Sequence, residues 1–331
     1  MAGWGTRMRP HTYSKPKSLI SVAGKATLGH LLDMFKTLPN PDRTEYIFIV
    51  DPFLGMSQIP EFVKQHDPEI NAHVVVQREM KGQSHALWIG HEYAHGPTLA
   101  VFADTLIKTD FSFLKDNFQE AAVWVKPVPD PRRFGVVELG KDEEVVHLIE
   151  KPQTMENNLV VVGCYYLPKG EDLMQAIEDQ MGNNISLAKE YYLADAVNLL
   201  LDRGLKMRIQ KVETWLDTGT IDSTLETNRY LLENNRPEIN QSFKRENVIV
   251  DPVFIHPDAI ITNSVIGPYA SIGPHCKIIG SHVEDSILEE GVQLTDAALK
   301  GSLVGKCAEI KGRSTDTPIR LNIGDYSSLI L

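Results

Sequence analysis

The 331-residue sequence is poor in cysteine, contains no long apolar run and has no excess of basic residues. The cysteines lie far apart without paired spacing, which argues against a disulfide framework or a zinc site; they are Cys164, Cys276 and Cys307. No apolar run approaches the roughly 18 residues of a membrane span, and no signal peptide opens the sequence. The net charge of -11 also disfavours nucleic acid as a partner. We therefore expect a cytoplasmic protein that binds neither nucleic acid nor a membrane.

The composition and length fit a globular protein of two domains. Hydrophobic residues make up 42% and charged residues 23%, which is ordinary for a folded chain. A chain of 331 residues suffices for about two domains. Because the apolar pattern changes after Pro237, we predict one domain over residues 1–236 and a second over 237–331.

Strands and helices alternate in the first predicted domain. Continuous apolar runs predict buried strands at 46–51, 72–77 and 98–104. Helices are expected before and between them, at 28–38, 58–66 and 83–93. This alternation indicates an α/β fold with a mostly parallel sheet covered on both faces. Apolar segments over 121–168 predict antiparallel strands in an insertion, followed by helices at 171–180, 186–203 and 220–234 and a strand at 207–212.

The second predicted domain carries short repeats in place of helical patterns. Ile266, Ile272 and Ile278 recur at the hexapeptide spacing, which is the rhythm of a left-handed parallel β-helix. The rhythm is ragged over 281–300, and the stretch 248–312 has room for about three coils. Since such coils offer flat contact surfaces, we expect a homo-oligomer.

The opening stretch from Met1 to Lys17, MAGWGTRMRPHTYSKPK, forms a loop rich in glycine and cations. Gly3 and Gly5 allow left-handed turns and close approach to a ligand, and successive N–H groups there can form an anion-binding concavity. Arg7 offers a planar fork of donors suited to phosphate, and Lys17 offers a point charge. The loop therefore predicts a site for a polyanionic ligand; a basic surface loop that binds nothing is the alternative.

The motif G-x-G-T-R-x-R-P-x-T, followed by P-K, narrows the class of ligand that the loop could bind. It lacks the third glycine of a dinucleotide fingerprint and the G-K-S/T of an ATPase loop. It resembles the signature of the sugar-1-phosphate nucleotidyltransferases, also called nucleotide-sugar pyrophosphorylases, in which a strand precedes the loop; this sequence has none before Gly3. The resemblance implies a Rossmann-like nucleotidyltransferase domain with a mixed central sheet. It also implies a nucleotide site made of Ala2, Gly3, Gly5, Thr6, Arg7, Gln77 and Gly82.

Two aspartates are candidate ligands for Mg²⁺. Asp104 ends a predicted strand, and ligands bind beyond the carboxyl ends of the strands in open parallel sheets. Mg²⁺ prefers one or two carboxylates together with phosphate oxygens. Asp217, in W-L-D-T-G-T, resembles the second metal aspartate of the family. Each aspartate alone could equally cap a turn or a helix.

The resemblance also implies binding roles for residues in two further short motifs. In the family, the amide of a residue placed like Gln77 reads the nucleobase, and a glycine placed like Gly82 leaves room for the ring; an amide both donates and accepts hydrogen bonds. Glu150 and Lys151 resemble the E-K-P block, which holds the sugar hydroxyls and the sugar phosphate. Gly135 resembles the glycine whose backbone faces the sugar. Each block taken alone could be an ordinary turn or strand end.

The resemblance implies transfer of a nucleotidyl group from a nucleoside triphosphate to a sugar 1-phosphate, with release of pyrophosphate. Arg7, Lys17 and Asp104 would be catalytic. The opening A-G-x-G-T-R favours dTTP or UTP and glucose 1-phosphate. The alternatives are an adenylyl- or guanylyl-specific member, or a non-catalytic regulatory or scaffold subunit of the same architecture. A less favoured reading is an acyltransferase that uses a histidine of the repeat region, namely His256, His275 or His282.

Overall fold

The computed structural model describes residues 3–115 and 118–331. The chain forms two compact units. The first is made mainly of Leu31–Trp215, and the second combines Trp4–His30 with Leu216–Leu331. The opening loop therefore folds together with the C-terminal part of the chain. No helix in the described ranges is both long enough and apolar enough to cross a membrane.

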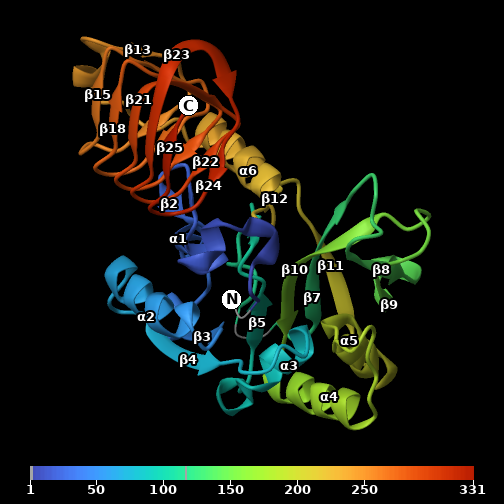
Figure 1. Cartoon of the computed structure of the whole chain (residues 1–331). Helices are drawn as coiled ribbons and strands as arrows, with labels where there is room; N and C mark the ends of the chain where they lie inside the picture. Colours follow the sequence, from blue (N-terminus) through green and yellow to red (C-terminus); the bar gives the residue numbers. More distant parts are fainter. Residues whose placement is uncertain (1–2, 116–117) are drawn as a thin grey trace. The chain divides into compact units, whose positions relative to one another are not determined.

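The first unit is built on a mixed sheet (Figure 1). The strands of this sheet are β5 (Thr98–Val101), β7 (Ala121–Pro127), β8 (Gly135–Leu139), β9 (Val145–Glu150), β10 (Leu159–Leu167) and β11 (Met207–Lys211). Strand β10 is antiparallel to β5 and β7, whereas β11 is parallel to β7. Strands β3 (Glu45–Val50) and β4 (Asn71–Val76) form a separate parallel pair. The short strand β6 (Thr105–Ile107) also belongs to this unit, and the division between the two units falls within the short strand β12 (Trp215–Asp217).

Strands β7 and β10 belong to the centre of this sheet and not to an insertion. All of β7 up to Val125 is buried, and so is all of β10 from Val160 onward. Strands that are covered on both faces become continuously apolar, so their sequence resembles that of any buried strand. The expectation of an antiparallel insertion over 121–168 is therefore wrong for these two strands, although the antiparallel pairing itself is confirmed.

The helices lie where the apolar patterns predict them, with two shifted starts. They are α1 (Thr27–Phe35), α2 (Leu54–His66), α3 (Gln83–Trp88), α4 (Gly170–Gly182), α5 (Leu193–Asp202) and α6 (Ile221–Asn235). Helix α2 starts at 54 instead of 58 because the Asp51 carboxylate accepts the N–H groups of Phe53, Leu54 and Gly55, each at 2.9 Å. Helix α5 starts at 193 instead of 186. The residues from 186 to 192 form an irregular segment.

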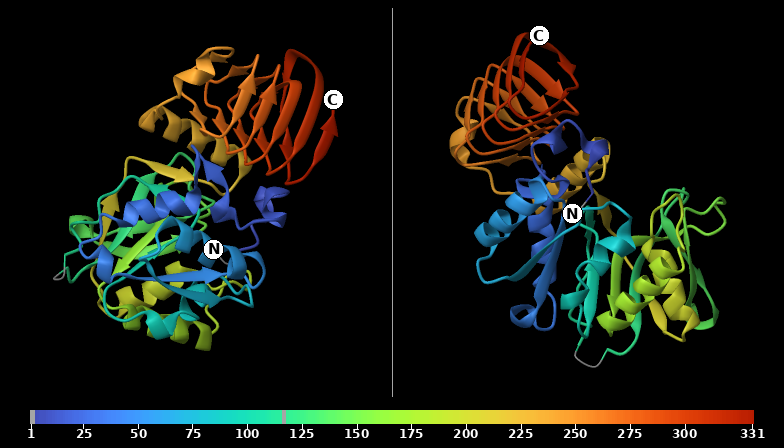
Figure 2. Two further views of the ribbon diagram at one scale, coloured as in Figure 1. Left: turned by 90° about the vertical axis from the view of Figure 1, so that its left-hand side faces the viewer. Right: turned by 60° about the horizontal axis from the view of Figure 1, so that its bottom comes forward.

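The second unit contains a parallel β-solenoid of about five turns, as expected for a left-handed β-helix (Figure 2). Its strands are β13 (Val248–Ile249), β14 (Phe254–Ile255), β15 (Ile260–Thr262), β16 (Val265–Ile266), β17 (Ser271–Ile272), β18 (Lys277–Ile279), β19 (His282–Glu284), β20 (Ile287–Leu288), β21 (Gln293–Lys300), β22 (Leu303–Val304), β23 (Glu309–Ile319), β24 (Asn322–Ile323) and β25 (Ser328–Ile330). The hairpin β1 (Ser21–Val22) and β2 (Lys25–Ala26) belongs to the same unit.

The solenoid is longer than the repeat pattern suggests. Lys277 pairs with Gln293, so this turn of the coil is shorter than three full hexapeptides. Leu303 pairs with Asn322, and that turn is longer than three full hexapeptides. Because the spacing varies, the hexapeptide rhythm is lost after 278 while the coil continues to Ile330. The expectation of about three coils is therefore wrong.

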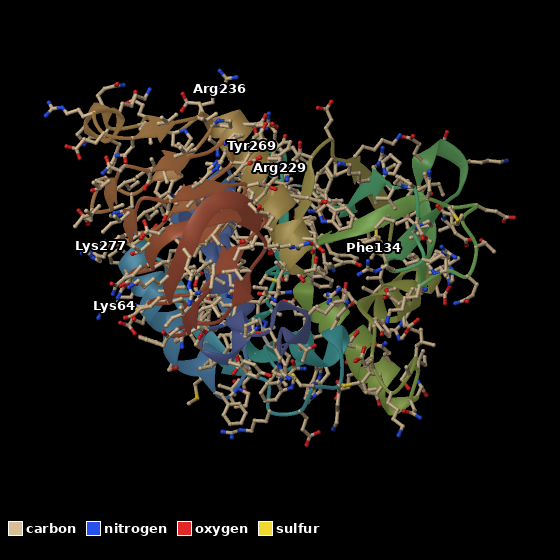
Figure 3. All side chains as sticks on the ribbon, turned by 45° about the horizontal axis from the view of Figure 1, so that its top comes forward. Lys64, Phe134, Arg229, Arg236, Tyr269 and Lys277 are labelled. Carbon is tan, nitrogen blue, oxygen red and sulfur yellow. The ribbon has the colours of Figure 1, made fainter. Side chains whose placement is uncertain are left out.

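Helix α6 is attached to the solenoid by polar contacts. A capping box of Thr220 and Ser223 starts the helix. Further along, Arg229 forms an ion pair with Asp285 at 2.6 Å, and its guanidinium lies 5.5 Å from the centre of the Tyr269 ring. Figure 3 labels Arg229 and Tyr269 in this region. The helix is thus held against the β-helix coils by a charge pair and a cation–π contact.

The column of aliphatic side chains inside the solenoid predicts a large effect of truncation. Ile278, Leu294 and Ile310 are paired in register and at most 2% exposed. We expect Ile278→Ala to lower the free energy of unfolding by about 2–5 kcal/mol, because it leaves a cavity. The matched control, Ile260→Ala, changes a side chain that is 60% exposed and should stay within about 0.5 kcal/mol of wild type. Urea denaturation measures both, and equal effects would contradict this account of the core.

Candidate functional site

The candidate site residues are divided between the two compact units. The second unit holds Gly5, Thr6, Arg7, Lys17 and Asp217. The first unit holds Gly3, Gln77, Gly82, Asp104, Gly135, Glu150 and Lys151. Ala2 lies outside the described residues.

The opening loop is a compact series of short turns. Gly5 adopts the left-handed conformation, with φ 58° and ψ 31°, and its carbonyl accepts the Thr12 hydroxyl at 2.9 Å. A Cβ at Gly5 would lie 2.9 Å from the Thr12 methyl group and 3.5 Å from the Cβ of Lys17. The expected left-handed turn is thus confirmed at Gly5. At Gly3 the φ lies outside the left-handed region, and a Cβ would meet no atom within 4 Å.

Arg7 and Asp217 lie beside the same glycine. The Oδ1 atom of Asp217 accepts the N–H of Gly219 at 2.9 Å. A Cβ at Gly219 would be 2.8 Å from that Oδ1 and 3.4 Å from a terminal nitrogen of Arg7. The side chain that caps α6 is Thr220, so Asp217 is not the helix cap. The Asp217 carboxylate is oriented by a backbone amide and half-buried, next to an exposed guanidinium.

The E-K-P block and its glycine meet in the first unit. Gly135 pairs with Glu150 across β8 and β9. A Cβ at Gly135 would lie 3.1 Å from a carboxylate oxygen of Glu150. The N–H of Lys151 donates to the Phe134 carbonyl at 2.9 Å. Burial raises the pKa of Glu150, since the carboxylate is removed from water. The strand pairing therefore brings together residues that are well separated in the sequence.

Tyr192 is a neighbour of Lys151 that the sequence patterns miss. The Lys151 ammonium donates to the Tyr192 hydroxyl at 2.5 Å and lies 4.5 Å from the ring centre. The Tyr192 hydroxyl in turn donates to the Glu190 carboxylate at 2.8 Å. The hydrogen bond to Tyr192 raises the pKa of Lys151 and so favours its charged form. The signal in the sequence is the tandem Tyr191–Tyr192 after Glu190, which a predicted helix over 186–203 obscures.

The turn after β4 packs against the same segment. Gly82 has φ 102°, and a Cβ there would lie 2.6 Å from the backbone N and O of Tyr191. The N–H of Tyr191 donates to the Lys81 carbonyl at 2.8 Å, and the N–H of Ser84 donates to the Tyr191 carbonyl at 3.0 Å. Residues 190–192 therefore contact both the Gly82 turn and Lys151.

The amide of Gln77 is engaged inside the protein. Gln77 is 3% exposed, and its Nε2 lies 3.4 Å from the Gly82 carbonyl and 3.1 Å from Nδ1 of His85. Burial lowers the pKa of His85, which leaves Nδ1 free to accept this hydrogen bond. The side chain of Gln77 thus fixes the turn whose shape Gly82 permits.

Asp104 lies in the turn between β5 and β6 and is half-buried. This turn follows the carboxyl end of β5, as expected from the sequence. Within residues 3–115 and 118–331, no group of three or more histidine, cysteine or acidic side chains is arranged to hold a metal ion. The metal prediction therefore depends on the two aspartates Asp104 and Asp217 alone.

The close approach at Gly82 gives a test of the turn. We expect Gly82→Ala to lower the free energy of unfolding by about 1–3 kcal/mol, because the new Cβ would clash with the Tyr191 backbone in a left-handed conformation. Gly96→Ala is the matched control, since Gly96 also has a positive φ but open space around it. Its cost should be only the conformational one, about 1–2 kcal/mol at most. Urea denaturation compares the two, and a smaller loss for Gly82→Ala than for Gly96→Ala would contradict the contact.

We expect the buried His11 to make the stability of the second unit dependent on pH. His11 is fully buried; its Nε2 donates to Asn322 at 2.7 Å, and its Nδ1 has no hydrogen-bond partner among the described residues. Burial lowers the pKa of His11 below 6.5, and the charge of Lys15 lowers it further. The hydrogen bond to Asn322 and the charges of Glu289 and Asp325 oppose this shift. The neutral form thus favours the folded state, and that stability is lost as pH falls below 6.5 through the lowered value.

We therefore expect His11→Gln, which keeps a donor but cannot titrate, to flatten the loss of stability between about pH 7 and pH 5. His95→Gln is the control, because the His95 side chain is 71% exposed. Melting temperatures across this range measure the effect. If the melting temperature of His11→Gln falls with pH as steeply as that of wild type, another group controls the pH dependence.

Comparisons with known proteins identify the family. The chain matches the nucleotidyl transferase family over residues 1–234. Glucose-1-phosphate thymidylyltransferase of Streptomyces antibioticus is 29% identical, and the match covers 99% of this chain and 97% of that protein. The low-salt glycan biosynthesis nucleotidyltransferase Agl11 of Haloferax volcanii is 28% identical over 99% of this chain and 98% of its own.

A solved structure shares the fold. The crystal structure of a UDP-glucose pyrophosphorylase in complex with UDP-glucose superposes with a TM-score of 0.58 at 19% identity. The match covers 70% of this chain and 96% of that one. At this identity the likeness concerns the fold alone. Because the family match spans more than half of its residues, the chain belongs to the nucleotidyl transferase family.

Proposed function

We propose that this nucleotidyl transferase joins a nucleoside triphosphate to a sugar 1-phosphate and releases pyrophosphate. The observation that carries the proposal is the meeting of two blocks at residues 190–192. The turn of Gln77 and Gly82 packs on Tyr191, and the ammonium of Lys151 binds Tyr192. A base-binding turn and a sugar-phosphate-binding lysine fixed to one segment suit a reaction between two bound substrates.

The proposed chemistry is an in-line displacement. A phosphate oxygen of the sugar 1-phosphate attacks the α-phosphorus of the triphosphate, and the bond from the α-phosphorus to the bridging oxygen breaks. The electron pair leaves on pyrophosphate. No general base is needed, because the attacking phosphate is already an anion. Positioning and charge stabilisation therefore account for the catalysis.

The cations and the amides of the opening loop are assigned to the phosphates. The backbone at Gly3, Gly5 and Thr6, together with the Arg7 guanidinium, would hold the triphosphate. Lys17 and Lys151 would hold the sugar phosphate. The hydrogen bond to Tyr192 raises the pKa of Lys151 and favours its charged form, which this role requires.

We assign Asp104 and Asp217 to Mg²⁺. Carboxylate oxygens suit this hard cation, and the Asp217 carboxylate is already oriented by the Gly219 N–H. The ion would neutralise charge on the phosphates of the bound triphosphate. The rest of the site depends on the protein's own residues, with Glu150 and the backbone of Gly135 facing the sugar.

The preferred substrates are dTTP or UTP and glucose 1-phosphate. The opening A-G-x-G-T-R and the thymidylyltransferase from Streptomyces antibioticus support this preference. An adenylyl- or guanylyl-specific enzyme is the alternative. We place the enzyme in the cytoplasm, where these substrates are made, and expect it to work as a homo-oligomer through the flat faces of its solenoid.

Substitution of the loop arginine and the first aspartate tests the mechanism. We expect Arg7→Ala and Asp104→Asn each to keep the fold and to lower kcat by about 10²–10³, because each removes a preorganised charge from the site. Arg9→Ala is the matched control from the same loop. Arg9 is exposed, with its guanidinium 4.8 Å from the centre of the Tyr13 ring. Pyrophosphate release measures the rates, with dTTP, UTP, ATP and GTP screened against glucose 1-phosphate.

Near-normal rates of pyrophosphate release in both variants would contradict the proposed mechanism. Calorimetric titration of the wild-type chain with each triphosphate and Mg²⁺ separates the enzyme from a scaffold subunit. A chain that binds triphosphate but releases no pyrophosphate with any sugar 1-phosphate would favour the scaffold.

A further inference from the structure

The opening loop is joined to the last turns of the solenoid by buried polar contacts that the proposed reaction does not use. We propose that Glu289 and Asp325 are positioning residues for this loop. They act through Lys15 and Ser14 to hold Arg7 in the geometry that binds the triphosphate. The inference rests on the proposed function of the loop, and all the residues involved belong to the second compact unit.

The strongest of these contacts is a buried ion pair. The Lys15 ammonium contacts the Glu289 carboxylate and lies 3.4 Å from Oδ1 of Asp325. The side chains are 13%, 6% and 6% exposed, respectively. An exposed pair contributes little, whereas removal of one partner from a buried pair leaves an uncompensated charge. Loss of one partner of this pair should therefore disturb the loop far more than loss of one partner of a surface pair would.

The solenoid holds the Asp325 carboxylate directly, and it holds Glu289 through its backbone. The backbone N–H of Lys306 donates to Oδ1 of Asp325 at 2.8 Å, and the Ser14 hydroxyl donates to Oδ2 at 2.7 Å. The backbone N–H of Glu289 donates to the Val304 carbonyl at 3.0 Å within the strand ladder. Each carboxylate thus links a regular β-coil to the irregular loop.

Apolar contacts surround this polar centre. Met8 is fully buried in a cluster that includes Ile287 and Leu303 of the solenoid. A Cβ at Gly324 would lie 3.1 Å from the Cβ of Pro10. The loop residues that meet the solenoid therefore run from Met8 to Lys15.

Two of the residues proposed to bind phosphate, Arg7 and Lys17, flank this stretch in the sequence. Arg7 is exposed and Lys17 is half-buried. The loop consists of short turns, at Thr6–Met8, His11–Tyr13 and Lys17–Leu19, and has no long helix or strand to keep its shape. A loop of this kind must be ordered when a ligand binds, unless another part of the protein orders it beforehand. The solenoid provides that order.

Removal of either partner of the ion pair tests the role. We expect Glu289→Gln and Lys15→Met each to raise the KM for the nucleoside triphosphate about tenfold, with a smaller effect on kcat, because a loosened loop binds less well but still reaches the same transition state. The double variant should be no worse than Lys15→Met alone, since that substitution already removes the contact with Glu289. Lys15→Arg keeps the charge and should restore most of the affinity.

The control is a second ion pair on the same solenoid turns. Lys306 and Glu290 form a pair at 2.7 Å whose side chains are 37% and 44% exposed. Glu290→Gln should leave the KM unchanged. Hydrogen exchange of the amides of residues 5–20, measured without substrate, should be faster in Glu289→Gln than in wild type and unchanged in Glu290→Gln.

The outcomes are distinguishable. Faster exchange with an unchanged KM would show that Glu289 is merely structural, and unchanged exchange with an unchanged KM would also overturn the inference. A wild-type chain that binds no triphosphate in the presence of Mg²⁺ would remove the proposed function together with the positioning role. A wild-type chain that binds triphosphate, paired with a Glu289→Gln variant that binds equally well, would remove the positioning role alone.

Discussion

The burial of Met8 is the apolar contact on which the shape of the opening loop depends, beside the buried ion pair of Lys15. The loop consists of short turns, and such turns have too few internal hydrogen bonds to hold themselves in one conformation. Met8 is fully buried with Ile20 and Val22 from the hairpin segment, Leu225 from α6, and residues of the solenoid. Several separate stretches of sequence thus enclose one side chain. Because protein interiors are close-packed, the loop can adopt only conformations that keep this side chain in place.

The sequence patterns predict the kinds of element better than their limits. The α/β alternation and the hexapeptide rhythm both reflect burial, which repeats with the geometry of helix, strand or coil. The start of α2 depends instead on Asp51, a residue outside the helix whose carboxylate accepts three amides. The true length of the solenoid was hidden because its turns differ in length, as the pairings of Lys277 with Gln293 and of Leu303 with Asn322 show. A fixed period cannot reveal a coil whose corners vary in this way.

The candidate site likewise contains residues that sequence motifs predict and residues that they miss. Gly135, Glu150 and Lys151 were predicted from a motif, and the strand pairing brings them together. Tyr192 was missed because its contact with Lys151 joins residues 41 positions apart, which no local pattern encodes. The roles of Asp104 and Asp217 as metal ligands stay predictions, as does the division into domains at residues 236 and 237. The metal roles and the domain division both depend on residues that are far apart in the sequence, which local sequence patterns do not relate to one another.

The contact between Gly82 and Tyr191 restricts substitution at position 82 more than at position 191. At position 82 every side chain is excluded, since even a methyl group would meet main-chain atoms 2.6 Å away. At position 191 the contact is made by the amide and carbonyl, which every residue except proline carries in full. A side chain at position 82 therefore disturbs the junction directly, whereas position 191 contributes only main-chain atoms to it. Related chains can vary at 191 and still build the same junction, provided that they keep a glycine opposite it.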